Sequence, residues 1–130
     1  MNDIRVPISP GELLDKITIL RIKEARITDP AKLANVRIEL QLLEGTWRES
    51  GCATAAVASD ERALHEVNER LWDIEDRIRD KEARQSFDRD FIELARAVYL
   101  YNDERAAIKK RINLHLGSRI VEEKSYKPYR

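Results

Sequence analysis

Apolar residues recur at steps of three and four through much of this chain, a spacing that places side chains on one side of an α-helix. A first stripe runs from Leu64 to Ile78, and a longer one follows from Phe87. The longer stripe consists of Phe87, Phe91, Leu94, Val98, Tyr101, Arg105, Ile108 and Ile112. We therefore predict two long antiparallel helices, at about 60–85 and 87–116, joined in a hairpin.

Two further helices are predicted upstream by their start signals. Ser9 is followed by Pro10, and Glu12 completes a capping box, so a helix is expected over about 10–27. Asp29 is likewise followed by proline, which indicates a second helix over about 30–50.

The first of these helices carries apolar residues on more than one side. Its main stripe is formed by Leu13, Ile17 and Leu20, while Leu14 and Ile22 lie off that stripe. Apolar residues on two sides indicate two neighbours, one of which is expected to be a second subunit. The pattern therefore favours a homodimer.

These elements predict an all-α fold: one helical domain over 1–130, with two antiparallel helical hairpins. A short extended N-terminal arm is expected, because Ile4, Val6 and Ile8 alternate with other residues. The C-terminal tail mixes cations with tyrosines, including Lys124 and Tyr126. We expect the tail to be partly ordered and to fold back as a lid or a dimer strap.

Composition narrows the function classes. Charged residues make up 37% of the chain, and 24 Lys and Arg balance 24 Asp and Glu. With no net charge there is no overall field to attract nucleic acid, so no nucleic-acid partner is expected. No apolar run approaches the ~18 residues that a helix needs to cross a membrane, so no membrane-spanning helix is expected. The single cysteine, Cys52, favours a cytoplasmic location.

Polar residues replace apolar ones on the facing sides of the two long predicted helices. Counting back from a turn near Ser86 places Asn68 beside Arg105. This polar seam supplies the candidate ligand-binding residues, which are Asn68, Trp72, Glu75, Arg79, Arg96, Tyr99, Asn102, Asp103 and Arg105.

Two roles are compatible with such a seam. Its guanidinium groups can hold a carboxylate or phosphate through paired N–H donors, with Glu75 or Tyr99 moving protons. Alternatively, the same groups form an ion-pair network that sets the helix register, with Arg105 as the specifying residue. Buried polar groups need partners in either case, and the sequence leaves open whether that partner is ligand or protein.

An acidic line on the third predicted helix raises the question of a metal site. Glu66, Asp73 and Asp80 each precede an arginine by four residues, the favourable order for ion pairs on a solvated helix face. The fourth helix offers no matching acidic pair. The chain also has no zinc, di-iron, P-loop or dinucleotide-binding pattern, so no metal or cofactor is expected.

Four segments together resemble a family of small, mostly helical bacterial proteins of unknown function. They are the Ser-Pro-Gly-Glu-Leu-Leu-Asp-Lys-Ile-Thr-Ile-Leu run from Ser9, Leu-Trp-Asp-Ile-Glu-Asp from Leu71, Asn-Asp-Glu-Arg from Asn102, and Glu-Lys-Ser-Tyr from Glu123. The resemblance implies a gene context of surface polysaccharides. It implies no activity, because the family has none assigned.

A looser architectural likeness is to the all-helical chorismate mutases, helical dimers whose arginine and lysine residues grip two carboxylates. Arg79, Arg96, Arg105 and Lys109 would be available here, with Glu75 nearby. The long first-helix motif of that family has no match, so the likeness remains an analogy. We expect a homodimer with an interaction or small anionic-ligand-binding role. The alternative is an enzyme acting on a carboxylate- or phosphate-bearing metabolite, of chorismate-mutase type or related to sugar phosphates.

Overall fold

The computed structural model describes residues 2–129, and within them it shows four α-helices, one short 3-10 helix and no strand. The elements are α1 (Pro10–Arg26), α2 (Pro30–Ser50), η1 (Thr54–Val57), α3 (Ala58–Ala83) and α4 (Arg89–His115). The all-α fold predicted from the sequence is confirmed. Each α-helix begins and ends within two residues of its predicted bounds.

Three of the α-helices begin at side-chain caps, and the caps of α1 and α2 are those that the sequence indicates. The Ser9 hydroxyl accepts a hydrogen bond from the Glu12 backbone N–H at 3.1 Å, and Asp29 and Asp88 cap α2 and α4 in the same way. α3 differs, because it starts at Ala58 without a side-chain cap. The small residues of η1 lead directly into it, so α3 continues an existing turn.

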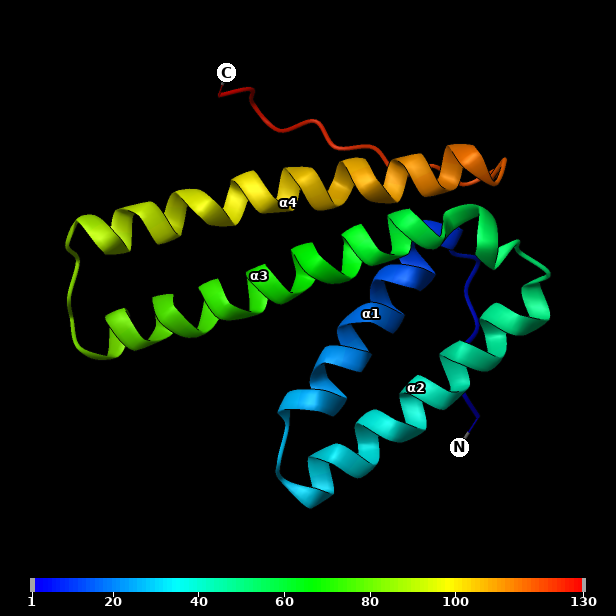
Figure 1. Ribbon diagram of the computed structural model, residues 1–130, viewed down its shortest axis with the longest axis horizontal. Coiled ribbons are helices and arrows are strands. Elements are labelled where there is room, and N and C mark those ends of the chain that lie inside the picture. Colours follow the sequence, from blue (N-terminus) through cyan, green and yellow to red (C-terminus); the bar gives the residue numbers. More distant parts are fainter. Residues whose placement is uncertain (1, 130) are drawn as a thin grey trace.

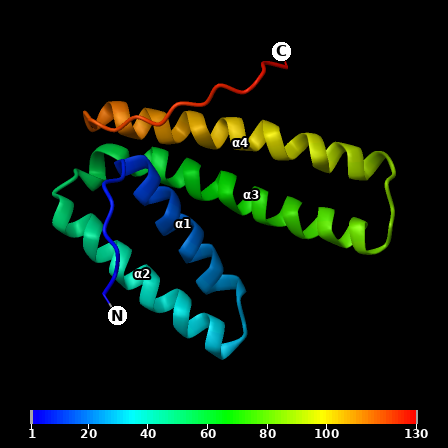
Figure 2. The same cartoon turned by 180° about the vertical axis from the view of Figure 1, so that it is seen from behind.

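The helices pair as two antiparallel hairpins, α1 with α2 and α3 with α4 (Figures 1 and 2). α1 lies between the two, since it contacts α2 on one side and both α3 and α4 on the other. Among the described helices, α2 contacts only α1. α1 is therefore the element that joins the two hairpins.

The hydrophobic core lies where α1 meets the base of the α3–α4 hairpin. Its fully buried side chains include Leu14 and Ile17 of α1, Leu64 of α3, and Ile108 and Ile112 of α4. The off-stripe residues of α1 that favoured a second subunit are thus covered by the same chain. They give no reason of their own for a dimer.

The far half of the α3–α4 hairpin extends beyond α1 and α2 (Figure 1). Between residues 72 and 100, only Ile74 and Leu94 are buried. In the described chain α1 reaches only the near edge of this part, where Arg26 contacts Trp72 and Asp73. Its two helices therefore leave most of their surface open.

Both ends of the described chain are extended. Residues 2–7 are exposed, and residues 117–129 turn back and run along α4 (Figure 1). Ile120 and Val121 of this tail are half-buried, whereas Tyr126 is 80% exposed. Within residues 2–129, no helix combines the length and apolar character needed to cross a membrane.

Candidate functional site

A buried carboxylate, Asp15, lies at the meeting point of α1, α3 and α4. Only 1% of its surface is exposed. The Arg105 guanidinium of α4 donates to both carboxylate oxygens, from Nε at 2.9 Å and from Nη2 at 2.5 Å. The Asn68 amide of α3 donates to Oδ1 at 2.9 Å. One side chain of α1 is thus bound by both helices of the opposite hairpin.

This arrangement keeps Asp15 ionised. Burial alone raises the pKa of its carboxyl group, because a charge is harder to hold away from water. Hydrogen bonds from Arg105 and Asn68, and the charges of Arg105 and Lys109, outweigh that effect and hold the pKa below its usual value. The same bond raises the pKa of the Arg105 guanidinium. The pair is therefore charged at neutral pH.

The polar contacts continue along α1 in both directions. Asn68 also donates to the Thr18 hydroxyl at 3.0 Å. On the other side, the Lys109 ammonium lies 2.5 Å from Glu12 and 3.6 Å from Asp15. We call Glu12, Asp15, Thr18, Asn68, Arg105 and Lys109 the Asp15 cluster. Every buried side-chain N or O atom in the described residues has a hydrogen-bond partner.

The start of α1 lies unusually close to α4 beside this cluster. The Gly11 backbone N–H donates to Asn113 Oδ1 at 2.7 Å. A Cβ atom at position 11 would lie 2.5 Å from the Lys109 carbonyl oxygen, well inside van der Waals contact. Glycine is thus required here by space, and Gly11 allows the close approach that brings Asp15 to Arg105.

The structure brings six of the nine predicted seam residues to one crevice and leaves three elsewhere. The crevice has a volume of about 450 Å³ and opens between α1, α3 and α4. Leu71, Ile19 and Ile22 supply part of its apolar wall. The six seam residues that line it are Asn68, Trp72, Glu75, Arg79, Asn102 and Arg105.

Both guanidinium groups of this crevice are already paired with carboxylates. Arg105 binds Asp15, and Arg79 donates to Glu75 of its own helix at 3.3 Å. Asp76 adds a further negative charge to the lining. The crevice therefore has the size of a ligand site but no excess of positive charge.

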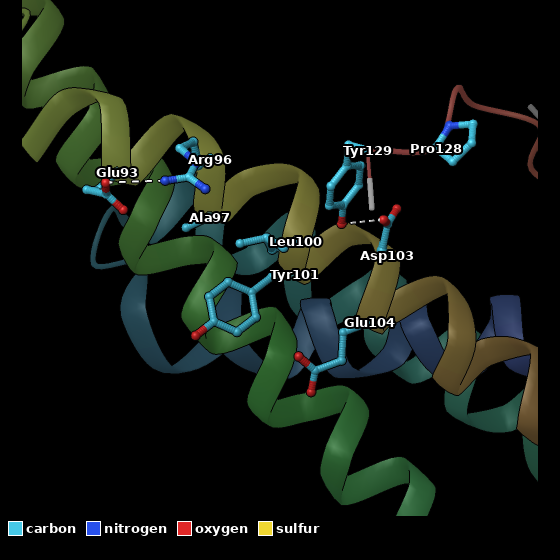
Figure 3. Close-up of a pocket in the computed structure, with 9 residues that line it drawn as sticks. All are labelled: Glu93, Arg96, Ala97, Leu100, Tyr101, Asp103, Glu104, Pro128 and Tyr129. Carbon is cyan, nitrogen blue, oxygen red and sulfur yellow. Dashed lines mark hydrogen bonds and ion pairs between the residues drawn. The ribbon is translucent and has the colours of Figure 1, made fainter. Parts of the chain in front are cut away.

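The other three predicted seam residues, Arg96, Tyr99 and Asp103, lie on the outer face of α4. Arg96 pairs with Glu93 at 3.5 Å, and the Tyr129 hydroxyl donates to Asp103 at 2.7 Å. Figure 3 shows this side, where Arg96 and Asp103 border an open cavity of about 810 Å³. Three acidic residues line that cavity against one arginine. It is separate from the crevice and acidic in character.

A third cavity, of about 400 Å³, lies between α4 and the tail. It shares Asn102 and Arg105 with the crevice, so these two residues separate the two spaces. We call it the α4–tail cavity. Its charged lining residues are Arg105, Lys109, Lys110 and Lys124, opposed by Glu122 and Glu123.

The two glutamates of the tail are held loosely in this cavity. Both carboxylate oxygens of Glu123 lie 3.2 Å from the Lys110 ammonium, and Glu122 lies 3.9 Å from Lys109. Glu123 remains 72% exposed. Lys110 thus holds a tail carboxylate in an arrangement open to water, whereas Arg105 and Lys109 already hold Asp15 and Glu12 of α1.

The sequence interpretation missed Asp15 and Asn113 as residues of a site. Along the sequence Asp15 is one of several charged residues of the first helix, with Lys16 and Arg21 among its neighbours. Lys16 is exposed and Arg21 pairs with Glu61 at 2.8 Å, outside the three cavities described above. The available signal was the apolar residues on several sides of α1, which indicate that a charge there becomes buried.

Comparison with known proteins identifies the family of this chain. No curated protein matches it, and no solved structure matches it. A family model described as a family of unknown function, DUF6165, matches residues 4–129. That match covers nearly the whole chain, and the small helical family that the four sequence segments resembled is consistent with it. The chain belongs to the family of unknown function DUF6165.

Proposed function

We propose that this protein binds a small anionic ligand in the α4–tail cavity. The observation that carries the proposal is the convergence of four cations, Arg105 and three lysines, on one space of about 400 Å³. Asn102 and Asn113 add amide groups to the lining. Cations together with amide donors are the usual partners of carboxylate and phosphate groups.

The electrostatics favour this cavity over the other two. The crevice and the outer cavity each carry at least as many carboxylates as cations in their linings. The carboxylates that line the α4–tail cavity, Glu122 and Glu123, come only from the tail. Arg105 and Lys109 also pair with Asp15 and Glu12 of α1, so Lys110 and Lys124 are the cations that no carboxylate of α1 opposes. A ligand carboxylate or phosphate would take the place of Glu123 on Lys110, an exchange that costs little because that pair is exposed.

Thermal-shift and calorimetric titrations test this site with succinate, inorganic phosphate and a nucleotide sugar. A ligand that binds the folded form must raise its melting temperature. We expect at least one of these anions to do so. We expect the Lys110→Ala/Lys124→Ala double variant to weaken that binding at least tenfold, because it removes two of the four cations.

Arg79→Ala is the matched control, because Arg79 lines the crevice and is 79% exposed. It should leave binding unchanged. If Arg79→Ala abolishes binding and the lysine variant does not, the ligand site is the crevice. If none of the three anions binds, the proposal is wrong.

We also infer that the protein acts as a homodimer, on grounds of surface area. The chain exposes 9259 Å². A compact monomer of its 15.2 kDa mass exposes roughly 7,100 Å². The excess of about 2,100 Å² is larger than the ~800 Å² per partner covered in a typical stable interface. The extended arm and tail contribute to the excess, and so does the uncovered half of the α3–α4 hairpin.

A further inference from the structure

Two stripes of residues define one face of the α3–α4 hairpin, the face on which α1 packs. On α3 the stripe runs Asn68, Leu71, Glu75, Ile78 and Glu82, at steps of three and four. On α4 it runs Phe91, Ala95, Val98, Asn102, Arg105 and Lys109. We call these two stripes, with Arg79 beside Glu75 at the edge of the α3 stripe, the seam face.

α1 covers only the lower part of the seam face. Asn68, Arg105 and Lys109, at the base of the two stripes, all contact Asp15 of α1. Leu71 lies beside Ile19 and Ile22 of α1 in the wall of the crevice. Farther out, Ile78, Phe91 and Val98 are half-buried, in the half of the hairpin that extends beyond α1 and α2 (Figure 1). Apolar residues at this spacing are normally covered by another element. In the described chain no helix covers the upper part of the seam face.

We propose that the upper seam face is covered by the same face of a second copy, so that two hairpins form a four-helix bundle. This inference rests on the homodimer proposed above and names its interface. Four-helix bundles are the usual way in which helical hairpins bury apolar stripes of this spacing.

The charges on this face suit a two-fold axis. Glu75 and Arg79 have opposite signs and lie one turn apart on α3. In a symmetric interface the same patch meets itself, so residue i of one copy faces residue j of the other and the reverse. With the axis between these two residues, Glu75 of each copy faces Arg79 of the other. The second copy also covers the crevice lined by Trp72 and Asn102.

Sedimentation equilibrium on the full chain tests the interface through exposed residues, whose substitution leaves the fold intact. Arg79→Glu places like charges opposite each other across the axis and is expected to raise the dimer dissociation constant at least tenfold. The double variant Glu75→Arg/Arg79→Glu exchanges the two charges. It should restore the dissociation constant to within about threefold of that of the parent chain, because the reciprocal pairs are re-formed.

Arg77→Glu is the matched control, since Arg77 is also exposed and lines a different cavity of α3. It should leave the dissociation constant unchanged. If the parent chain is a dimer and Arg79→Glu weakens it no more than Arg77→Glu does, the named face is wrong and the homodimer stands. If the parent chain is a monomer at 100 µM, the homodimer and its interface are both overturned. The anion titrations decide separately on the ligand site.

Discussion

The guanidinium of Arg105 binds both oxygens of Asp15 across a separation of 90 residues in the chain. The carboxylate is almost completely buried, while the arginine side chain is 30% exposed. This contact joins α1 to α4, and Asn68 joins the same carboxylate to α3. The position of α1 on the hairpin, and with it both cavities that share Arg105, depends on this pair.

Removing one partner of the pair should destabilise the fold strongly. Asp15→Asn leaves the Arg105 guanidinium without its anion, and we expect a loss of about 3 kcal/mol in the free energy of unfolding. Urea denaturation measures this value. The exposed pair Asp80–Arg84, at 3.2 Å, provides the control, and Asp80→Asn should change stability by less than about 0.5 kcal/mol. Equal effects of the two variants would contradict the assigned role of Asp15.

Stability should fall in acid, and Asp15 should carry part of that fall. The pKa of this carboxyl is lower in the folded state than in the unfolded one. Its contribution is therefore complete above the unfolded value, near ~4, and is lost as pH decreases through the folded value. Urea denaturation at several pH values between 6 and 3 measures how the free energy of unfolding changes with pH. This pH dependence should be weaker in Asp15→Asn than in the parent chain. If the pH dependence is the same in both proteins, Asp15 does not contribute to the loss of stability in acid.

Two glycines in helices should respond to alanine in opposite directions. Gly11→Ala places a Cβ against the Lys109 carbonyl, and we expect a loss of about 1–3 kcal/mol from the resulting shift of α1. At Gly45 of α2 the nearest atom is the tip of Arg48 at 3.7 Å. Gly45→Ala should therefore stabilise the protein by about 0.5–1 kcal/mol, through helix propensity alone. Thermal denaturation distinguishes the two, and a stabilising Gly11→Ala would refute the close approach.

Asp88 should stabilise α4 as its N-cap. Its carboxylate accepts a hydrogen bond from the Phe91 backbone N–H at 3.0 Å and pairs with Lys81 at 2.8 Å. The hydrogen bond from Lys81, followed by that from Phe91, lowers the pKa of Asp88 to about 2. Asp88→Ala should lower the free energy of unfolding, because the first turn of α4 loses its side-chain cap. Asp90 is a neighbouring acid that does not cap the helix. Denaturation followed by circular dichroism should therefore show a smaller decrease in the free energy of unfolding for Asp90→Ala than for Asp88→Ala.

Local signals account for how much of the fold was predictable. Caps such as Ser9 and Asp29, each followed by proline, and apolar steps of three and four depend on residues close together in sequence. They placed the helix bounds within two residues. The Asp15 cluster depends instead on how α1 lies against α3 and α4. No local pattern reports that arrangement, so the sequence does not distinguish Asp15 from the other charged residues of its helix.

The predicted seam was partly misplaced for a reason visible in the spacing. Arg96, Tyr99 and Asp103 are three and four residues apart and form a stripe of their own. Asn102 lies six residues from Arg96, which turns it about 120° away around a helix with 3.6 residues per turn. The prediction combined two stripes of α4 into one. The structure separates them into the crevice side and the tail side.

Because Asp15 and Arg105 are far apart in the sequence, the contact between α1 and α4 can form only late during synthesis of the chain. α1 is synthesised well before α4. Until α4 is present, the Asp15 carboxylate is therefore hydrated by water. Asp15 can be fully paired only once α4 is present, because α4 supplies the matching guanidinium. The contacts of the first hairpin with the rest of the core are therefore complete only after the chain has been synthesised through α4.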